Sequence, residues 1–139
     1  MRRLCAILVG FAVSLSGFVP SASAVPAASV SDEDQVRAVL DGMNGAYNRE
    51  DFASFAEHVC APMRLSADFA AKWYANRKAD GPTEIAVSSV RVAGEPKLTA
   101  AATVRFAAAN RPEAKIFDID FLREGSEWKA CRYHPARSI

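Results

Sequence analysis

The sequence predicts an α+β fold in which N-terminal helices pack on one face of a curved, mainly antiparallel four-stranded sheet. Apolar residues recur at helical spacing from Ser31 to about residue 80. From Thr83 onward their period changes to two, which is typical of strands. Turn residues then divide the second half into four alternating runs. Helices that precede all strands favour segregation of the helices to one side of the sheet.

Residues 1–24 have the composition of a cleavable export signal. Arg2 and Arg3 precede an apolar run, and the small residues at positions 22–24 offer a cleavage site after Ala24. The apolar run is shorter than the roughly 20 residues of a membrane-spanning helix. We therefore expect a secreted or cell-envelope protein that does not span the membrane in its mature form. An uncleaved anchor is the alternative.

The rest of the chain is predicted to be a flexible Ala/Pro linker, 25–30, followed by one domain, 31–139. Lipidation is disfavoured, because Cys5 precedes the apolar run and would be removed with the signal. Cleavage removes two arginines and no acidic residue, so the mature chain has a net charge of about −1. Its basic residues are interspersed with acids, which argues against nucleic acid as a partner.

Cys60 and Cys131 are the two cysteines that remain after cleavage. An even pair in a small exported domain is most simply one disulfide. By the chain-entropy argument, closure of so long a loop contributes on the order of 4 kcal/mol to stability.

The first helix is predicted to begin at Ser31, a good N-cap with Asp34 at the third helical position. Its apolar face is Val36, Val39, Leu40, Met43 and Tyr47. A second stripe of small residues, Ala38, Gly42, Gly45 and Ala46, indicates either close packing or simple tolerance on an exposed face.

Two shorter helices are expected next. The pattern Phe52, Phe55, Ala56 and Val59 runs into Cys60, and Pro62 limits its continuation. Ser66 then caps a pattern that includes Phe69, Trp73 and Tyr74, and the sequence at 80–82, Asp-Gly-Pro, ends the helical half.

The first strand, near residues 85–92, changes phase at Ser88 and Ser89, which predicts a β-bulge. The second strand presents Leu98, Ala100, Ala102, Val104 and Phe106 on one face, and the third presents Phe117, Ile119 and Phe121. A hairpin loop at 124–127 precedes the last strand. If Cys60 bonds Cys131, alternation places Tyr133 inward beside it and Trp128 on the outer face.

This pattern resembles the nuclear transport factor 2-like superfamily, in particular its small exported bacterial members. Residues 46–52 (AYNREDF), 60–62 (CAP) and 121–131 (FLREGSEWKAC) carry the resemblance. It implies a cone-shaped domain whose sheet wraps a long helix and leaves an apolar pocket at its open end, often in a homodimer. The superfamily contains isomerases, dehydratases and many binding modules, so the fold does not select an activity.

Asp118 and Asp120 are the sharpest catalytic candidates, because carboxylates at i and i+2 of a strand share a face. A buried pair could supply a general acid and a general base. The alternation of Phe117, Ile119 and Phe121 favours the opposite interpretation, in which both acids lie on the solvated face. Tyr47 could donate a proton, as the resemblance to ketosteroid isomerases implies.

Aromatic residues are candidates for the pocket wall, although ordinary core packing is the more general alternative for each. They are Tyr47, Phe55, Trp73, Tyr74 and Phe117. A zinc site of His58, Cys60, Cys131 and His134 is disfavoured, since residues two apart on a helix point in nearly opposite directions. We predict no metal and no cofactor.

The sequence favours an exported, non-catalytic domain that binds a small apolar ligand or an envelope protein. One alternative is a small lyase or isomerase that acts on a hydrophobic substrate through Asp118 or Asp120, with Tyr47. The other is a structural homodimerisation module with Trp128 at its interface.

Overall fold

The computed structural model describes residues 30–94 and 98–135. The predicted signal peptide, Cys5 and linker residues 25–29 lie outside the described residues. Helix α1 spans Asp32–Asn48, and the Ser31 side chain accepts a hydrogen bond from the Asp34 backbone N–H at 3.1 Å. The predicted N-cap is therefore confirmed.

Three further helical segments follow α1, one more than predicted. They are α2 (Phe52–Glu57), α3 (Ala61–Arg64) and α4 (Phe69–Asp80). Pro62 lies in the first turn of α3, where a fixed φ and a missing N–H favour helix initiation. Asp68, not Ser66, is the N-cap residue of α4, and the Ser66 hydroxyl donates to the Asp68 carboxylate at 2.9 Å.

The second half of the chain is a four-stranded antiparallel meander with the spatial order β1-β2-β3-β4. The strands are β1 (Thr83–Ala93), β2 (Thr99–Ala108), β3 (Lys115–Glu124) and β4 (Glu127–Pro135). The pairing of β1 with β2 shifts between Val87 and Ser89, which confirms the predicted bulge. The predicted α+β fold class is likewise confirmed.

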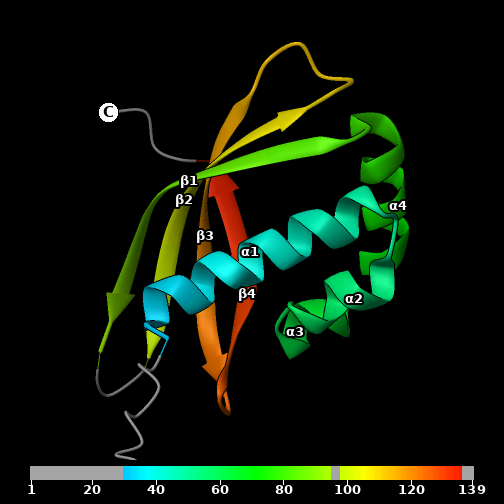
Figure 1. Ribbon diagram of the computed structural model, residues 1–139. Helices are drawn as coiled ribbons and strands as arrows, with labels where there is room; N and C mark the ends of the chain where they lie inside the picture. The colour runs from blue at the N-terminus through cyan, green and yellow to red at the C-terminus, as the bar shows by residue number, and fades with distance from the viewer. Residues whose placement is uncertain (1–29, 95–97, 136–139) are drawn as a thin grey trace, which may run out of the picture.

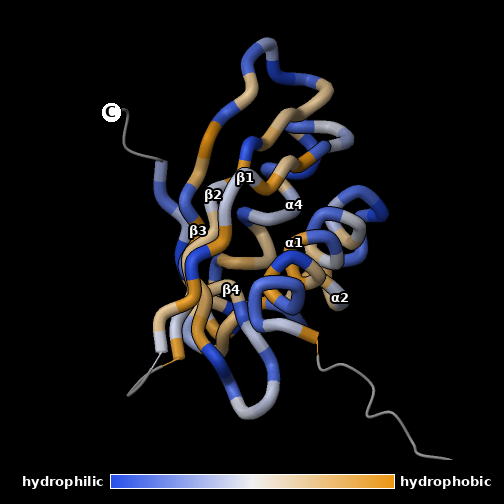
Figure 2. The backbone as a smooth tube through the Cα atoms, turned by 60° about the vertical axis from the view of Figure 1, so that its left-hand side comes forward, coloured by the Kyte–Doolittle hydropathy of each residue, from blue (hydrophilic) through white to orange (hydrophobic). Residues whose placement is uncertain are grey.

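The helices lie on one side of the curved sheet, and α1 crosses its inner face (Figure 1). Figure 2 shows the same layers from the side, with hydrophobic segments concentrated along the strands. Val36 and Leu40 of α1 belong to the same buried core cluster as Ala100 and Ala102 of β2. The small β2 side chains leave room for the larger side chains of the helix.

A second bulge, at Cys131, overturns the prediction for Trp128. Phe121 pairs with Ala130 whereas Asp120 pairs with Arg132, so Cys131 has no partner on β3. The extra residue keeps Trp128 and Ala130 on the inner face before the bulge. Trp128 is 2% exposed and belongs to the core, so it is not available for the dimer contact that the homodimerisation alternative assigned to it.

The same bulge joins the helical half to the sheet. Cys131 is disulfide-bonded to Cys60, and the two Cα atoms are 5.1 Å apart. Next to this bond the Cys60 N–H donates to the Ala130 carbonyl and the Ala130 N–H donates to the His58 carbonyl, each at 2.9 Å. Residues 58–60 therefore cover the free edge of β4. None of the described helices combines the length and apolarity that crossing a membrane requires.

Candidate functional site

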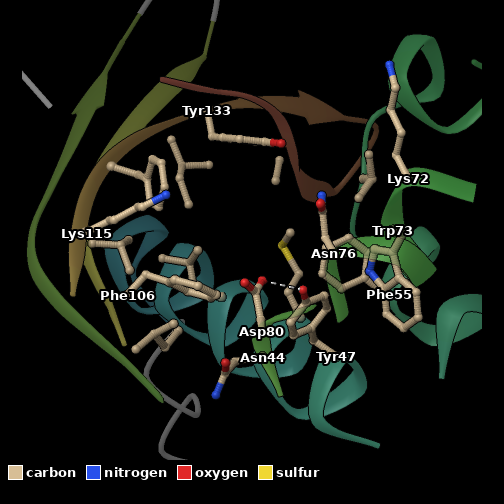
Figure 3. A pocket seen from close by; sticks show the side chains of 18 of the residues that line it. Asn44, Tyr47, Phe55, Lys72, Trp73, Asn76, Asp80, Phe106, Lys115 and Tyr133 are labelled. Atoms are coloured by element: carbon tan, nitrogen blue, oxygen red, sulfur yellow. Dashed lines mark hydrogen bonds between the residues drawn. The ribbon is translucent and has the colours of Figure 1, made fainter. Parts of the chain in front are cut away.

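A cavity of about 550 Å³ lies between the helices and the inner face of the sheet. Figure 3 shows side chains from the helices on one side of it and from the strands on the other. Its wall is mainly apolar. The apolar lining includes Leu40, Met43, Phe55, Val59, Met63, Phe69, Trp73, Ile85, Val104, Phe106, Phe117 and Ile119. This size and composition are typical of small-molecule sites.

Trp73 is the centre of the aromatic part of the wall. Its ring makes edge contacts with Tyr47 at 5.3 Å and with Phe55 at 5.4 Å between centroids. Phe52 and Tyr74 contact the same indole at 5.4 and 5.0 Å. Such edge-to-face packing fixes ring orientations and adds about 0.5–1.5 kcal/mol per pair beyond area burial. This wall is therefore preformed.

Most of the aromatic residues proposed from the sequence lie at this cavity. Tyr47, Phe55, Trp73 and Phe117 line it. Tyr74 does not belong to the lining and is 52% exposed, because it follows Trp73 on α4 and turns to a different side of the helix. Tyr133, which was predicted to point inward, lines the cavity and contacts Phe117 at 5.9 Å.

A phenol and a carboxylate meet inside the cavity. The Tyr47 hydroxyl donates to Asp80 Oδ2 at 2.8 Å, the contact drawn as a dashed line in Figure 3. Burial, followed by this hydrogen bond, raises the pKa of Tyr47 above its ordinary value of 10.0. Arg111 Nε donates to the other oxygen, Asp80 Oδ1, at 2.9 Å. The Asp80 side chain is only 14% exposed.

Asp80 was not among the site residues predicted from the sequence. It sits at the C-terminal end of α4, before Gly81 and Pro82, and was interpreted only as part of the helix stop. No local pattern identifies its partners, since Tyr47 is 33 residues earlier and Arg111 is 31 residues later.

Charged residues near the cavity are partly paired. The ammonium group of Lys72 is 2.6 Å from the Asp68 carboxylate. Asp80 is neutralised by Arg111. Lys115 and Glu113 also belong to the lining, and Figure 3 shows Lys115 on the strand side, beside Phe106.

The structure places Asp118 and Asp120 on the outer face of the sheet. They alternate with Phe117, Ile119 and Phe121, whose side chains face the helices, and neither acid lines the cavity. The Thr103 hydroxyl donates to Asp118 Oδ1 at 2.6 Å. Asp120 Oδ2 is 3.5 Å from His134 Nε2. Neither acid is therefore within reach of Tyr47.

The residues of the disfavoured zinc site do not converge. The two cysteines are bonded to each other. The His58 imidazole lies against Gly42 of α1, while His134 is near Asp120. Among residues 30–94 and 98–135, no three His, Cys, Asp or Glu side chains form a group that could hold a metal ion.

Comparisons with known proteins identify similar solved structures. No protein-family model matches the sequence, and no curated protein matches it significantly. A nuclear transport factor 2-like protein of unknown function from Shewanella oneidensis has a TM-score of 0.59 at 13% identity. The similarity covers 73% of this chain and 95% of that one.

A proposed dehydratase of the same structural family from Streptomyces avermitilis has a TM-score of 0.56 at 13% identity. The similarity covers 76% of this chain and 97% of that one. A Bdellovibrio bacteriovorus protein also has a TM-score of 0.56, at 11% identity, but only 40% of that chain is covered. At these identities the comparisons show a shared fold alone and do not bear on activity.

Proposed function

We propose that this chain, which has the nuclear transport factor 2-like fold, is an exported domain that binds a small apolar ligand without converting it. The observation that carries the proposal is the cavity of about 550 Å³ with its preformed aromatic and aliphatic wall. A rigid apolar cavity favours binding because little side-chain entropy is lost when a ligand enters.

The disulfide supports the export part of the proposal. Bonds such as Cys60–Cys131 persist in oxidising compartments and are rare in the cytosol. The predicted signal sequence at residues 1–24 fits the same location. Intact mass spectrometry of the protein from its own host tests this part. We expect a chain that begins at Val25 and lacks the mass of two thiol hydrogens.

The engagement of the polar groups in the cavity supports binding over catalysis. The Tyr47 hydroxyl donates a hydrogen bond to Asp80, and Asp80 also accepts a hydrogen bond from Arg111. A carboxylate that already accepts these two hydrogen bonds is a poor general base, because both bonds weaken when it takes up a substrate proton.

Adjacent residues on β3 provide the test of cavity binding. Phe117 lines the cavity, whereas Ile116 is on the outer face and 54% exposed. Titration with a neutral fluorescent probe, N-phenyl-1-naphthylamine, should show saturable binding. Phe117→Asn should weaken this binding about tenfold or more, because it exchanges apolar wall for an amide. Ile116→Asn should leave it unchanged.

Two results would contradict the proposal. One is the absence of saturable binding by a protein with native circular dichroism. The other is equal weakening by both substitutions, which would place the probe outside the cavity.

A lyase or isomerase is the second candidate, and the Tyr47–Asp80 contact is the observation that favours it. In this version Asp80 replaces Asp118 and Asp120, with Tyr47 as proton donor. A ligand that co-purifies with the protein should then be released chemically altered by the wild type, with a changed mass for a lyase or a changed chromatographic retention at equal mass for an isomerase, and unaltered by Asp80→Asn. An unaltered ligand in both cases supports the non-catalytic proposal.

A further inference from the structure

The indole N–H of Trp73 is a buried hydrogen-bond donor without a partner among the described residues. The side chain belongs to a residue that is 5% exposed and that lines the cavity. Buried donors in folded proteins are nearly always paired, since leaving one unpaired loses its hydration without compensation. The position of Trp73 therefore needs a partner that the described part of the chain does not provide.

The other tryptophan of the chain shows the contrast. Trp128 is also buried, and its Nε1 donates to Asp32 Oδ1 at 3.1 Å. The chain thus satisfies the indole in the core. Within residues 30–94 and 98–135, nothing pairs with the indole N–H in the cavity wall.

The surroundings of Trp73 explain why no side chain that the structure describes supplies an acceptor to its N–H. The indole is packed among the rings of Tyr47, Phe52, Phe55 and Tyr74. The nearest phenol, that of Tyr47, gives its hydrogen to Asp80. An N–H directed at a ring face makes only a weak contact.

Figure 3 shows the Trp73 indole in the cavity wall. Its Nε1 is closed off by the surrounding rings, so an acceptor reaches this atom only when an entering ligand displaces a neighbouring ring. We propose that the ligand carries a neutral acceptor oxygen on an apolar body, and that the Trp73 N–H donates to this oxygen. The inference rests on the proposed binding function and specifies the ligand class. A ketone or ester fits better than a carboxylate, because the rings around Trp73 would leave a buried charge uncompensated.

Two probes of nearly equal shape test the inference. 2-Acetylnaphthalene carries a carbonyl oxygen where 2-ethylnaphthalene has a methylene group. The wild-type protein should bind the ketone about tenfold more tightly, the ratio expected for one net hydrogen bond. Binding should also lower the carbonyl stretching frequency in difference infrared spectra.

Trp73→Phe keeps an aromatic wall and removes the donor, so the ratio of the two affinities should fall about tenfold or more, because the buried carbonyl is left without a donor. The matched control is Tyr74→Phe on the next residue of α4, which is exposed and outside the cavity lining. It should keep both the affinity ratio and the infrared shift. The ratio remains informative even if the smaller ring weakens both probes.

Each result has a distinct meaning. Equal affinities in the wild type, or a ratio that survives Trp73→Phe, would overturn the inference and show that water or a ring face satisfies the indole. Cavity binding would then still stand. If neither probe binds, the proposed function fails and the inference fails with it.

Discussion

At the scale of single residues, Asp32 connects the first turn of α1 to the β3–β4 hairpin. Its Oδ1 accepts hydrogen bonds from Arg123 at 2.6 Å and from the Trp128 indole at 3.1 Å. The Arg123 guanidinium also lies over the Trp128 ring, 5.6 Å from its centroid. One carboxylate therefore satisfies a buried donor and orients a cation near the core.

Asp32→Ala should lower the free energy of unfolding by about 1–3 kcal/mol, because the buried Trp128 N–H loses its acceptor. Urea denaturation followed by tryptophan fluorescence measures the change. Glu33→Ala is the control, since it removes an exposed i,i+4 pair with Arg37 from the same turn and should cost under about 1 kcal/mol. Equal losses in both variants would contradict the role of Asp32.

At the scale of elements, α1 contains two glycines with different surroundings. A Cβ at Gly42 would lie 2.6 Å from His58 Nε2. The absence of a side chain at Gly42 therefore makes room for the imidazole. A Cβ at Gly45 would meet only the end of the flexible Arg49 side chain, at 3.1 Å. Close packing against His58 therefore explains the glycine at position 42. At position 45 no such packing requires a glycine, and the residue is simply tolerated there.

Gly45→Ala should therefore stabilise the protein by up to about 1 kcal/mol through helix propensity. Gly42→Ala should lower stability, by roughly 1 kcal/mol or more, because overpacking exceeds the same propensity gain. Thermal and urea unfolding of the two variants give the comparison. His58→Ala should relieve the loss in Gly42→Ala, and a stabilising Gly42→Ala alone would show that the imidazole moves aside freely.

The position of His58 also predicts a dependence of stability on pH. Burial, followed by the nearby charge of Lys129, lowers the pKa of His58 below its ordinary value of 6.5, despite the opposing charges of Glu57 and Glu127. The unfolded chain then binds a proton at higher pH than the folded one. Stability is complete above about pH 6.5 and decreases as pH falls toward the folded-state pKa.

Urea midpoints measured between pH 8 and pH 5 should show this decrease, and His58→Gln should reduce it. His134→Gln, which removes the histidine beside Asp120 on the outer face, should retain it. A decrease of unchanged size in His58→Gln would assign the effect to other groups.

At the scale of the whole molecule, the Cys60–Cys131 bond closes the helical half onto the sheet across 71 residues of sequence. Hydrogen bonds between residues 58–60 and Ala130 make the same connection without the sulfurs. The covalent and backbone contacts therefore support one arrangement of the two layers.

The double variant Cys60→Ser/Cys131→Ser should keep the fold but lose on the order of 4 kcal/mol of stability, since its unfolded chain is no longer constrained by a long loop. Urea denaturation of the variant, beside the reduced and oxidised wild type, measures the loss. Reduced wild type should match the variant. Unchanged stability in the variant would show that the backbone contacts alone hold the two halves together.

Local patterns in the sequence predicted the elements well. The Ser31 cap, the stop at residues 80–82, the four strands and the bulge near Ser88 all depend on neighbouring residues, so a single pass along the chain finds them. The small turn of α3 was missed, because Pro62 can end one helix and begin another.

The sequence by itself determined the order of helices and strands, the two periodicities and the nature of the aromatic residues. Tertiary structure alone decided which side chains meet. The unpaired Cys131 reversed the predicted face of Trp128. Chain folding brought Asp80 to Tyr47 and left Trp73 without an acceptor among the residues that the structure describes. The reason is physical, because secondary structure follows from local spacing. One extra residue in a strand, in contrast, reverses the alternation of side chains on one side of the bulge relative to the other. Contacts between distant residues leave no local pattern at all.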